Sequence, residues 1–188
     1  LGPVRLKAGL SYTDIDAAER DCFFKPAADG SCFGNDIDTA TAAPIGTYLF
    51  DFEIYDVFAE VSFNVSEVPI VVWADYIKND AAQIDNKGYQ LGFQLGKAQN
   101  RGSWQIKYYY EDLEANATLG LLANSDFGGG GTNGKGSFVQ ATYATTDKTN
   151  IKFTYYAVEK NQNINPLLHS GTKFDWNTLF VDLNFKYK

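Results

Sequence analysis

The sequence has 188 residues and a formal net charge of −7 at pH 7, and 15% of its residues are aromatic. An acidic chain without a basic cluster binds nucleic-acid phosphates poorly, so we expect no nucleic-acid partner. No apolar run approaches the roughly 20 residues of a transmembrane helix. This does not exclude a membrane barrel, in which lipid-facing and lumen-facing residues alternate. The length fits a single domain, residues 1–188.

Apolar and polar residues alternate with a period of two along most of the chain, which is the pattern of β-strands with two unlike faces. In chain order, the eight predicted strands cover residues 3–13, 47–65, 68–78, 87–97, 103–114, 135–145, 149–160 and 174–187. Most have about ten residues, the length with which a tilted strand crosses the hydrocarbon of a bilayer.

The second predicted strand, residues 47–65, is too long for a single crossing. Its apolar residues are even-numbered up to Ile54 and odd-numbered from Val57 onward. A β-bulge near Tyr55 and Asp56 would explain this change of parity, as would emergence of the strand above the lipid at that point.

The connections between the predicted strands alternate in length. The long ones are residues 14–46, 79–86, 115–134 and 161–173, and the short ones are 66–67, 98–102 and 146–148. Tight periplasmic turns and long external loops give this alternation to outer-membrane barrels. We therefore predict an all-β, antiparallel up-and-down transmembrane β-barrel in the outer membrane of a Gram-negative bacterium, with both chain ends in the periplasm.

The alternation alone does not say which face points inward, because soluble barrels hide their apolar face and membrane barrels expose it. The aromatic residues of the apolar face lie mostly near strand ends and resemble the girdles of a membrane interface. They are Trp104, Tyr108, Tyr110, Tyr143, Tyr155, Phe185 and Tyr187. We therefore predict that the apolar face contacts lipid, with a soluble aromatic core as the alternative.

The polar face of the predicted strands carries charges of both signs. The candidates for the barrel interior are Arg5, Lys7, Glu60, Asp75, Lys107, Glu111, Lys152, Asp182 and Lys186. In a wide barrel such residues set a transverse field and let small polar solutes or ions diffuse passively. In a barrel closed by eight strands alone they would form an internal salt-bridge network that fills the interior.

Residues 119–134 combine a stretch that favours a short helical turn with a glycine run that predicts a flexible hinge. Such a segment either folds into the barrel as a constriction loop, with Asp126 and Phe127 facing the lumen, or remains a disordered external loop. The residues of the candidate constriction are Asp126, Phe127, Gly128, Gly129, Gly130 and Gly131.

Cys22 and Cys32 lie in a polar stretch of the first long connection. We predict a disulfide that closes a small external loop and forms in the oxidising periplasm, with two free thiols as the alternative. The stretch offers too few further ligands for a metal site.

The residues indicate no catalytic machinery. The single histidine, His169, lies beside Ser170 in a polar loop, which is typical of a solvated side chain rather than a catalyst. Carboxylate pairs such as Asp36 and Asp38 predict a solvated acidic rim, and weak Ca²⁺ binding at the external acidic loops is the alternative. We therefore predict no enzymatic activity, no cofactor and no dedicated metal site.

Several segments together carry a resemblance to a known family. They are VFAEVSFNV (57–65), VPIVVWADYIKN (68–79), GYQLGFQLGKAQNRGSWQIKYYYEDLEANA (88–117), LANSDFGGGGTNGKG (122–136) and DWNTLFVDLNFKY (175–187). The stretch 56–188 resembles a family of putative bacterial porins, and its most specific element is SDFGGGGTNGKG. Members of that family look like larger barrels whose C-terminal end matches these segments. The resemblance implies the C-terminal half of a barrel with about 16 strands, and a complete eight-stranded barrel is the alternative.

The resemblance implies an outer-membrane porin, a passive diffusion channel for small polar solutes or ions. The long connection 14–46 favours an alternative, a small structural or adhesive barrel that binds a partner through its external loops. The implied partners are the lipid bilayer with its lipopolysaccharide and small hydrophilic solutes. Association into a homotrimer or with another envelope protein stays open.

Overall fold

The computed structural model describes residues 3–22, 32–38, 46–161 and 172–186. In this part of the chain the main strands are β1 (Arg5–Ile15), β4 (Phe52–Val65), β5 (Val68–Asn79), β6 (Lys87–Gly96), β7 (Trp104–Leu113), β8 (Gly134–Ala144), β9 (Thr149–Lys160) and β10 (Phe174–Phe185). The short strands β2 (Ile37–Asp38) and β3 (Thr47–Tyr48) pair with each other, and η1 (Gly120–Leu122) is a single 3₁₀ turn. Among these residues, none of the helical segments has the length and apolarity needed to cross a bilayer.

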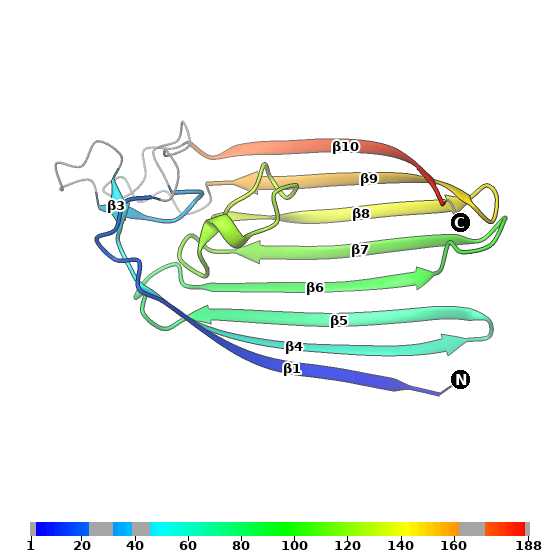
Figure 1. Ribbon diagram of the computed structural model, residues 1–188, viewed down its shortest axis with the longest axis horizontal. Coiled ribbons are helices and arrows are strands. Elements are labelled where there is room, and N and C mark those ends of the chain that lie inside the picture. Colours follow the sequence, from blue (N-terminus) through cyan, green and yellow to red (C-terminus); the bar gives the residue numbers. More distant parts are fainter. Residues whose placement is uncertain (1–2, 23–31, 39–45, 162–171, 187–188) are drawn as a thin grey trace.

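The main strands form one antiparallel sheet in which each strand pairs with its neighbours along the chain. Their order is β1-β4-β5-β6-β7-β8-β9-β10, so the predicted eight strands and their up-and-down order are confirmed. The strand ends that the long connections join lie at one end of the sheet, the loop end, and the short turns lie at the other, the turn end, where β1 begins and β10 ends (Figure 1). Within the described residues β1 and β10 do not pair, so the sheet is open and these strands are its edges.

The predicted second strand is wrong at its start. β3 ends at Tyr48 and β4 begins at Phe52, and β4 then pairs with β5 from Ile54 to Val65 without a bulge. Phe52 and Ile54 are only 1% and 6% exposed, because residues of the connection 16–51 cover them at the loop end. The apolar residues of β4 therefore change from odd to even positions where a folded loop covers the opposite face of the strand. At that point the side chains on the covered face are buried and apolar.

The pleat of each strand sends alternate side chains to two unlike faces of the sheet. On one face, which we call the apolar face, a row of paired residues crosses all eight strands. The row is Leu6, Val61, Val72, Phe93, Tyr108, Val139, Tyr155 and Leu179. Most exposed large hydrophobic side chains of the described residues belong to this face, with Leu10 at 74% and Leu91 at 56%.

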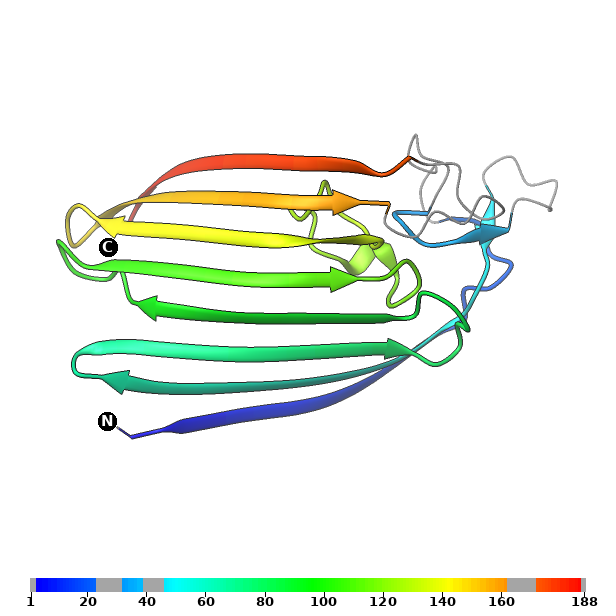
Figure 2. The same cartoon turned by 180° about the vertical axis from the view of Figure 1, so that it is seen from behind.

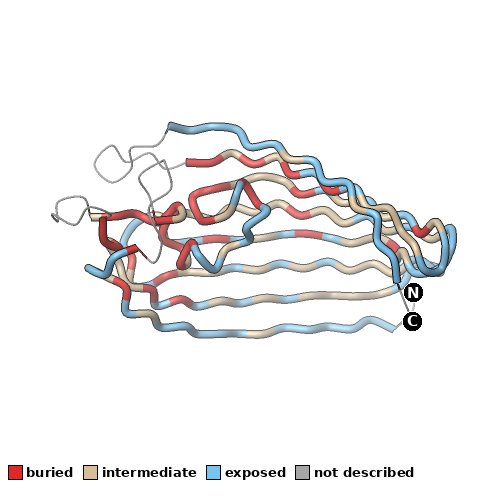
Figure 3. Tube along the Cα trace, turned by 45° about the horizontal axis from the view of Figure 1, so that its top comes forward, coloured by how far each residue is buried: buried red, intermediate tan, exposed pale blue. Residues whose placement is uncertain are grey.

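The opposite face, which we call the polar face, carries most of the buried side chains, and these lie at the loop end. Figure 3 shows most of the buried residues gathered there, whereas the strands toward the turn end are mostly half-buried or exposed. One buried cluster joins the connection 16–51 to Phe52 and Ile54. A second lies beneath residues 114–133, which connect β7 to β8.

Candidate functional site

Residues 114–133, which we call the inner segment, fold back over the polar face. Figures 1 and 2 show the sheet from opposite sides, with the inner segment in front of β7–β9 in one view and behind them in the other. Phe127 anchors it, since this side chain is 2% exposed and its ring lies 6.2 Å from that of Tyr109 and 6.3 Å from that of Tyr156. Burial of a phenylalanine side chain contributes about 1.5–3 kcal/mol.

A hollow of about 500 Å³ lies between the inner segment and strands β7–β10. Its lining residues are Lys107, Tyr109, Asn124, Asp126, Phe138, Gln140, Lys152, Thr154, Tyr156, Phe180 and Asp182. Charges of both signs meet there, and the Lys152 ammonium lies 2.9 Å from the Asp182 carboxylate. Such a lining offers hydrogen-bond donors, acceptors and charges to a hydrated solute.

The floor of the hollow is aromatic. The rings of Tyr109 and Phe138, on β7 and β8, stack at 4.5 Å, and Phe138 meets Tyr156 of β9 edge-on at 5.1 Å. The Lys107 ammonium lies 5.1 Å from the centre of the Trp73 ring and 5.7 Å from that of Phe138. This cation–π geometry stabilises the position of the lysine charge on the floor.

The aromatic floor is the part of the site that the sequence analysis missed. Tyr109, Phe138 and Tyr156 occupy the polar parity of three consecutive strands, where lumen-facing polar residues were expected. Large aromatic residues at polar-face positions of three neighbouring strands indicate that another part of the chain packs on this face. This pattern is the sequence signal that could have predicted the packed segment.

A second, smaller hollow lies between the inner segment and strands β5–β7, and two carboxylates line it. Asp75 and Glu111 line it together with Asn124, which borders both hollows. A chain of hydrogen bonds holds Glu111 in place. The indole Nε1 of Trp73 donates to Gln90 at 2.7 Å, and the Gln90 amide donates to the Glu111 carboxylate at 2.8 Å.

The predicted interior residues from Arg5 to Asp182 all lie on the polar face, and Lys186 follows the end of β10. The structure brings them together in three groups. Those at the larger hollow are Lys107, Lys152 and Asp182, those at the smaller one are Asp75 and Glu111, and those on β1 and β4 are Arg5, Lys7 and Glu60.

The glycine run at the inner segment is packed rather than open as a hinge. Gly128, Gly129, Gly130 and Gly131 all have positive φ. A Cβ on Gly131 would lie 2.2 Å from the carbonyl oxygen of Phe33. The run therefore lets the backbone of the inner segment approach its neighbours closely. Asp126 is exposed at the hollow, whereas Phe127 is buried beneath the segment.

Alanine at Gly131 is expected to destabilise the protein more than alanine at Gly102. Both positions have positive φ, at +77° and +82°, but a Cβ on Gly102 would meet nothing within 4 Å. The two variants share the cost of the backbone conformation, so their difference, about 1–3 kcal/mol, reports the close contact. Urea unfolding of both variants in lipid vesicles measures it, and equal losses would contradict the packing described.

The connection 16–51 contains the two cysteines and Asp36. The predicted solvated position of Asp36 in an acidic rim is wrong, because this residue is 2% exposed. Cys22 and Cys32 form a disulfide with their Cα atoms 5.7 Å apart. The carboxylate of Asp36 accepts a hydrogen bond of 2.6 Å from the side-chain amide of Asn116. The described residues hold no group of three or more potential metal ligands. His169 and Ser170 lie outside the described residues.

The apolar face has aromatic bands toward both ends of the strands. At the loop end, tyrosines of this face follow one another on neighbouring strands, as in the pair Tyr12 and Tyr55, whose rings lie 5.0 Å apart. The loop-end band is Tyr12, Tyr55, Tyr76, Tyr89 and Tyr110, and the turn-end band is Trp104, Tyr143 and Phe185. Tyr108 and Tyr155, predicted as girdle residues, belong to the row that crosses the sheet between the bands, and Tyr187 lies outside the described residues.

The fold and the site define an all-β protein of the antiparallel up-and-down class, with one apolar face and one polar face bearing a folded-back segment. A family model described as putative porin matches residues 39–187, which is most of the chain. The chain therefore belongs to the putative porin family, as the sequence resemblance predicted. No curated protein and no solved structure matches it.

Proposed function

We propose that the sheet is part of the wall of a transmembrane β-barrel in the bacterial outer membrane, with its apolar face on lipid. The row of apolar side chains that crosses all eight strands is the observation that carries this proposal. A continuous exposed apolar surface of this extent is unfavourable in water. Its largely apolar centre and its flanking aromatic bands match the hydrocarbon and the interfaces of a bilayer.

The open edges of the sheet require further strands in such a barrel. Unpaired backbone groups on β1 and β10 would each cost several kcal/mol in lipid. An eight-stranded barrel has room only for side chains, whereas the polar face here carries a folded segment and a hollow of about 500 Å³. A barrel of about 16 strands accommodates both and leaves a water-filled passage.

The polar face then lines a passive route for small polar solutes or ions. The inner segment narrows the passage, and Lys107, Lys152, Asp126 and Asp182 place both signs of charge at its narrow part. Polar and charged walls replace part of a solute's hydration and set ionic selectivity. The long connections would be external and the short turns periplasmic, which puts both chain ends in the periplasm.

Planar-bilayer recording tests this function directly. The refolded full-length protein is expected to insert with stepwise increases in current, and a protein that inserts without any current contradicts the proposal. The variant Lys107→Gln removes a charge at the hollow and is expected to shift the reversal potential in a salt gradient toward cations. Lys97→Gln is the matched control, because the exposed Lys97 lies in a short turn at the turn end of the sheet.

A further inference from the structure

We propose that residues 33–36, in the described part of the connection 16–51, are a latch that holds the inner segment in place. In this latch Asn35 is the positioning residue that holds the inner segment on the polar face, and the disulfide Cys22–Cys32 keeps Asn35 in place. The inference rests on the proposed function in one respect, namely that the inner segment narrows a passage. Its structural part, the dependence of the inner segment on Asn35, stands on the contacts alone.

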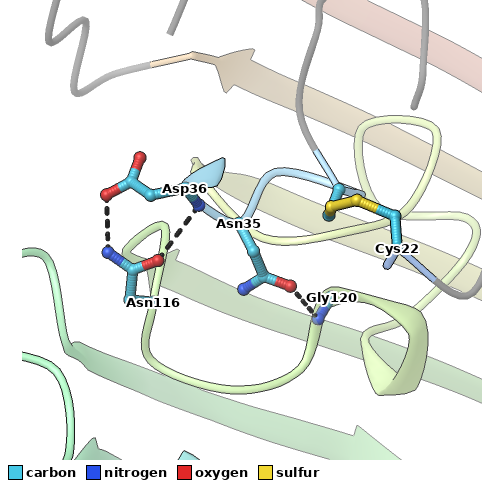
Figure 4. The surroundings of a disulfide bond; sticks show 6 residues. Cys22, Asn35, Asp36, Asn116 and Gly120 are labelled. Atoms are coloured by element: carbon cyan, nitrogen blue, oxygen red, sulfur yellow. Dashed lines mark hydrogen bonds between the residues drawn. A yellow bond between two sulfur atoms is a disulfide. The ribbon is translucent and has the colours of Figure 1, made fainter. Parts of the chain in front are cut away.

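The side-chain amide of Asn35 forms hydrogen bonds with the backbone of the inner segment (Figure 4). Its Nδ2 donates to the carbonyl oxygens of Ala115 at 2.6 Å and Thr118 at 2.8 Å, and its Oδ1 accepts from the backbone N–H of Gly120 at 2.7 Å. Asn35 is 1% exposed. One buried side chain therefore satisfies three backbone groups of a segment that is remote in sequence, and truncation would leave all three without this partner.

The neighbours of Asn35 hold both ends of the same segment. The backbone N–H of Asp36 donates to the Asn116 side chain at 3.1 Å, and the Asn116 amide donates back to the Asp36 carboxylate at 2.6 Å. The carbonyl oxygen of Phe33 accepts from the backbone N–H of Thr132 at 2.8 Å. Residues 33–36 thus contact both the beginning and the end of the inner segment. We call these four residues the clasp of the latch.

The disulfide joins residues 33–36 to the neighbourhood of β3, which pairs with β2 in a separate two-stranded sheet. Cys32 and Asn35 exchange backbone hydrogen bonds of 3.3 and 3.1 Å, so the turn that presents Asn35 starts at a bonded cysteine. Cys22 follows residues tied to β3, where the Tyr48 N–H donates to the Arg20 carbonyl at 3.0 Å. A covalent link therefore restrains the clasp relative to β3, and such links act by limiting the alternatives open to the chain.

Apolar contacts run along the same path. Leu119 of the inner segment is 4% exposed and belongs to the buried cluster that contains both cysteines and Tyr48. The inner segment is therefore held by residues 33–36 at the loop end, by Phe127 on the polar face, and by the Lys160 ammonium, which donates to the carbonyl oxygens of Gly130 at 2.9 Å and Thr132 at 2.8 Å. Release of the first attachment would remove the contacts of Asn35 and leave the other two in place.

Hydrogen exchange and single-channel recording on the full-length protein test the latch together. In Asn35→Ala the amide of Gly120 is expected to exchange at least about tenfold faster, since a buried hydrogen bond is lost, and single-channel conductance is expected to rise. Asn100→Ala is the matched control, because it removes the same side chain from an exposed turn at the opposite end. The control is expected to change neither quantity.

The double variant Cys22→Ser/Cys32→Ser provides a second test that leaves Asn35 intact. It is expected to raise both the exchange rate of the Gly120 amide and the single-channel conductance, as Asn35→Ala does. If Asn35→Ala fails to fold, this double variant alone tests the latch. Unchanged exchange and conductance in a folded variant overturn the latch. If the wild type inserts without current while Gly120 exchange still rises in the variants, the proposed function fails and the structural latch stands.

Discussion

Arginine in place of Leu91 is expected to cost about 2–4 kcal/mol of folding free energy in a lipid bilayer, the penalty for a charge near the midplane of a barrel's outer surface. Leu91 lies in the middle of β6 on the apolar face, is 56% exposed and pairs with Ala74 and Tyr110. Neither partner is acidic, so an arginine at position 91 would have no cross-strand carboxylate to pair with. In the absence of lipid the same change would be nearly neutral, because an exposed arginine is hydrated there.

The neighbouring variant Gln90→Arg is the matched control. Gln90 precedes Leu91 on the same strand, so its side chain points to the polar face, where Asp75 and Glu111 are its cross-strand partners. An arginine there meets two carboxylates but no longer accepts the hydrogen bond of the Trp73 indole, so it is expected to cost about 1 kcal/mol, less than Leu91→Arg. Reversible folding of both variants into vesicles, titrated with urea, gives the comparison. Equal penalties at 90 and 91 would mean that lipid does not distinguish the two faces.

The strands could be predicted because their signal is local. A residue and its second neighbour share a face of a strand, so the alternation around Leu91 or Val139 is visible within a few positions. The sorting of long and short connections is likewise a property of the chain order. The start of β4 was placed wrongly because the apolar character of Phe52 and Ile54 comes from a loop that covers them, and alternation carries no information about such a cover.

The site was less predictable because its contacts join distant parts of the chain. Asn35 contacts Ala115, 80 residues away in the sequence, and one asparagine in a polar loop gives no hint of such a partner. The glycine run predicts a hinge equally well as a close contact, because glycine permits both mobility and close packing. Only the position of Phe33 against Gly131 shows that close packing is its use here.

Phe127 provides the other large expected effect, on the inner segment rather than on the sheet. Phe127→Ala removes the ring that packs against Tyr109, Phe138 and Tyr156, and such truncations of buried phenylalanines cost about 3–5 kcal/mol. The strands pair through their own backbones, so we expect the sheet to persist while the inner segment leaves its floor. Single-channel conductance is then expected to rise, and protease is expected to cleave within residues 114–133 before it cleaves the strands.

Leu122→Ala separates this effect from a general weakening of the inner segment. Leu122 belongs to the same segment but is 65% exposed, so its truncation is expected to change stability by no more than about 0.5 kcal/mol. The two variants remove an apolar side chain from the same connection and differ in whether that side chain touches the polar face. If Leu122→Ala raises conductance as much as Phe127→Ala, the aromatic floor is not what holds the segment. If only Phe127→Ala does so, the rings at the polar parity of β7, β8 and β9 set the width of the passage together with the latch at the loop end.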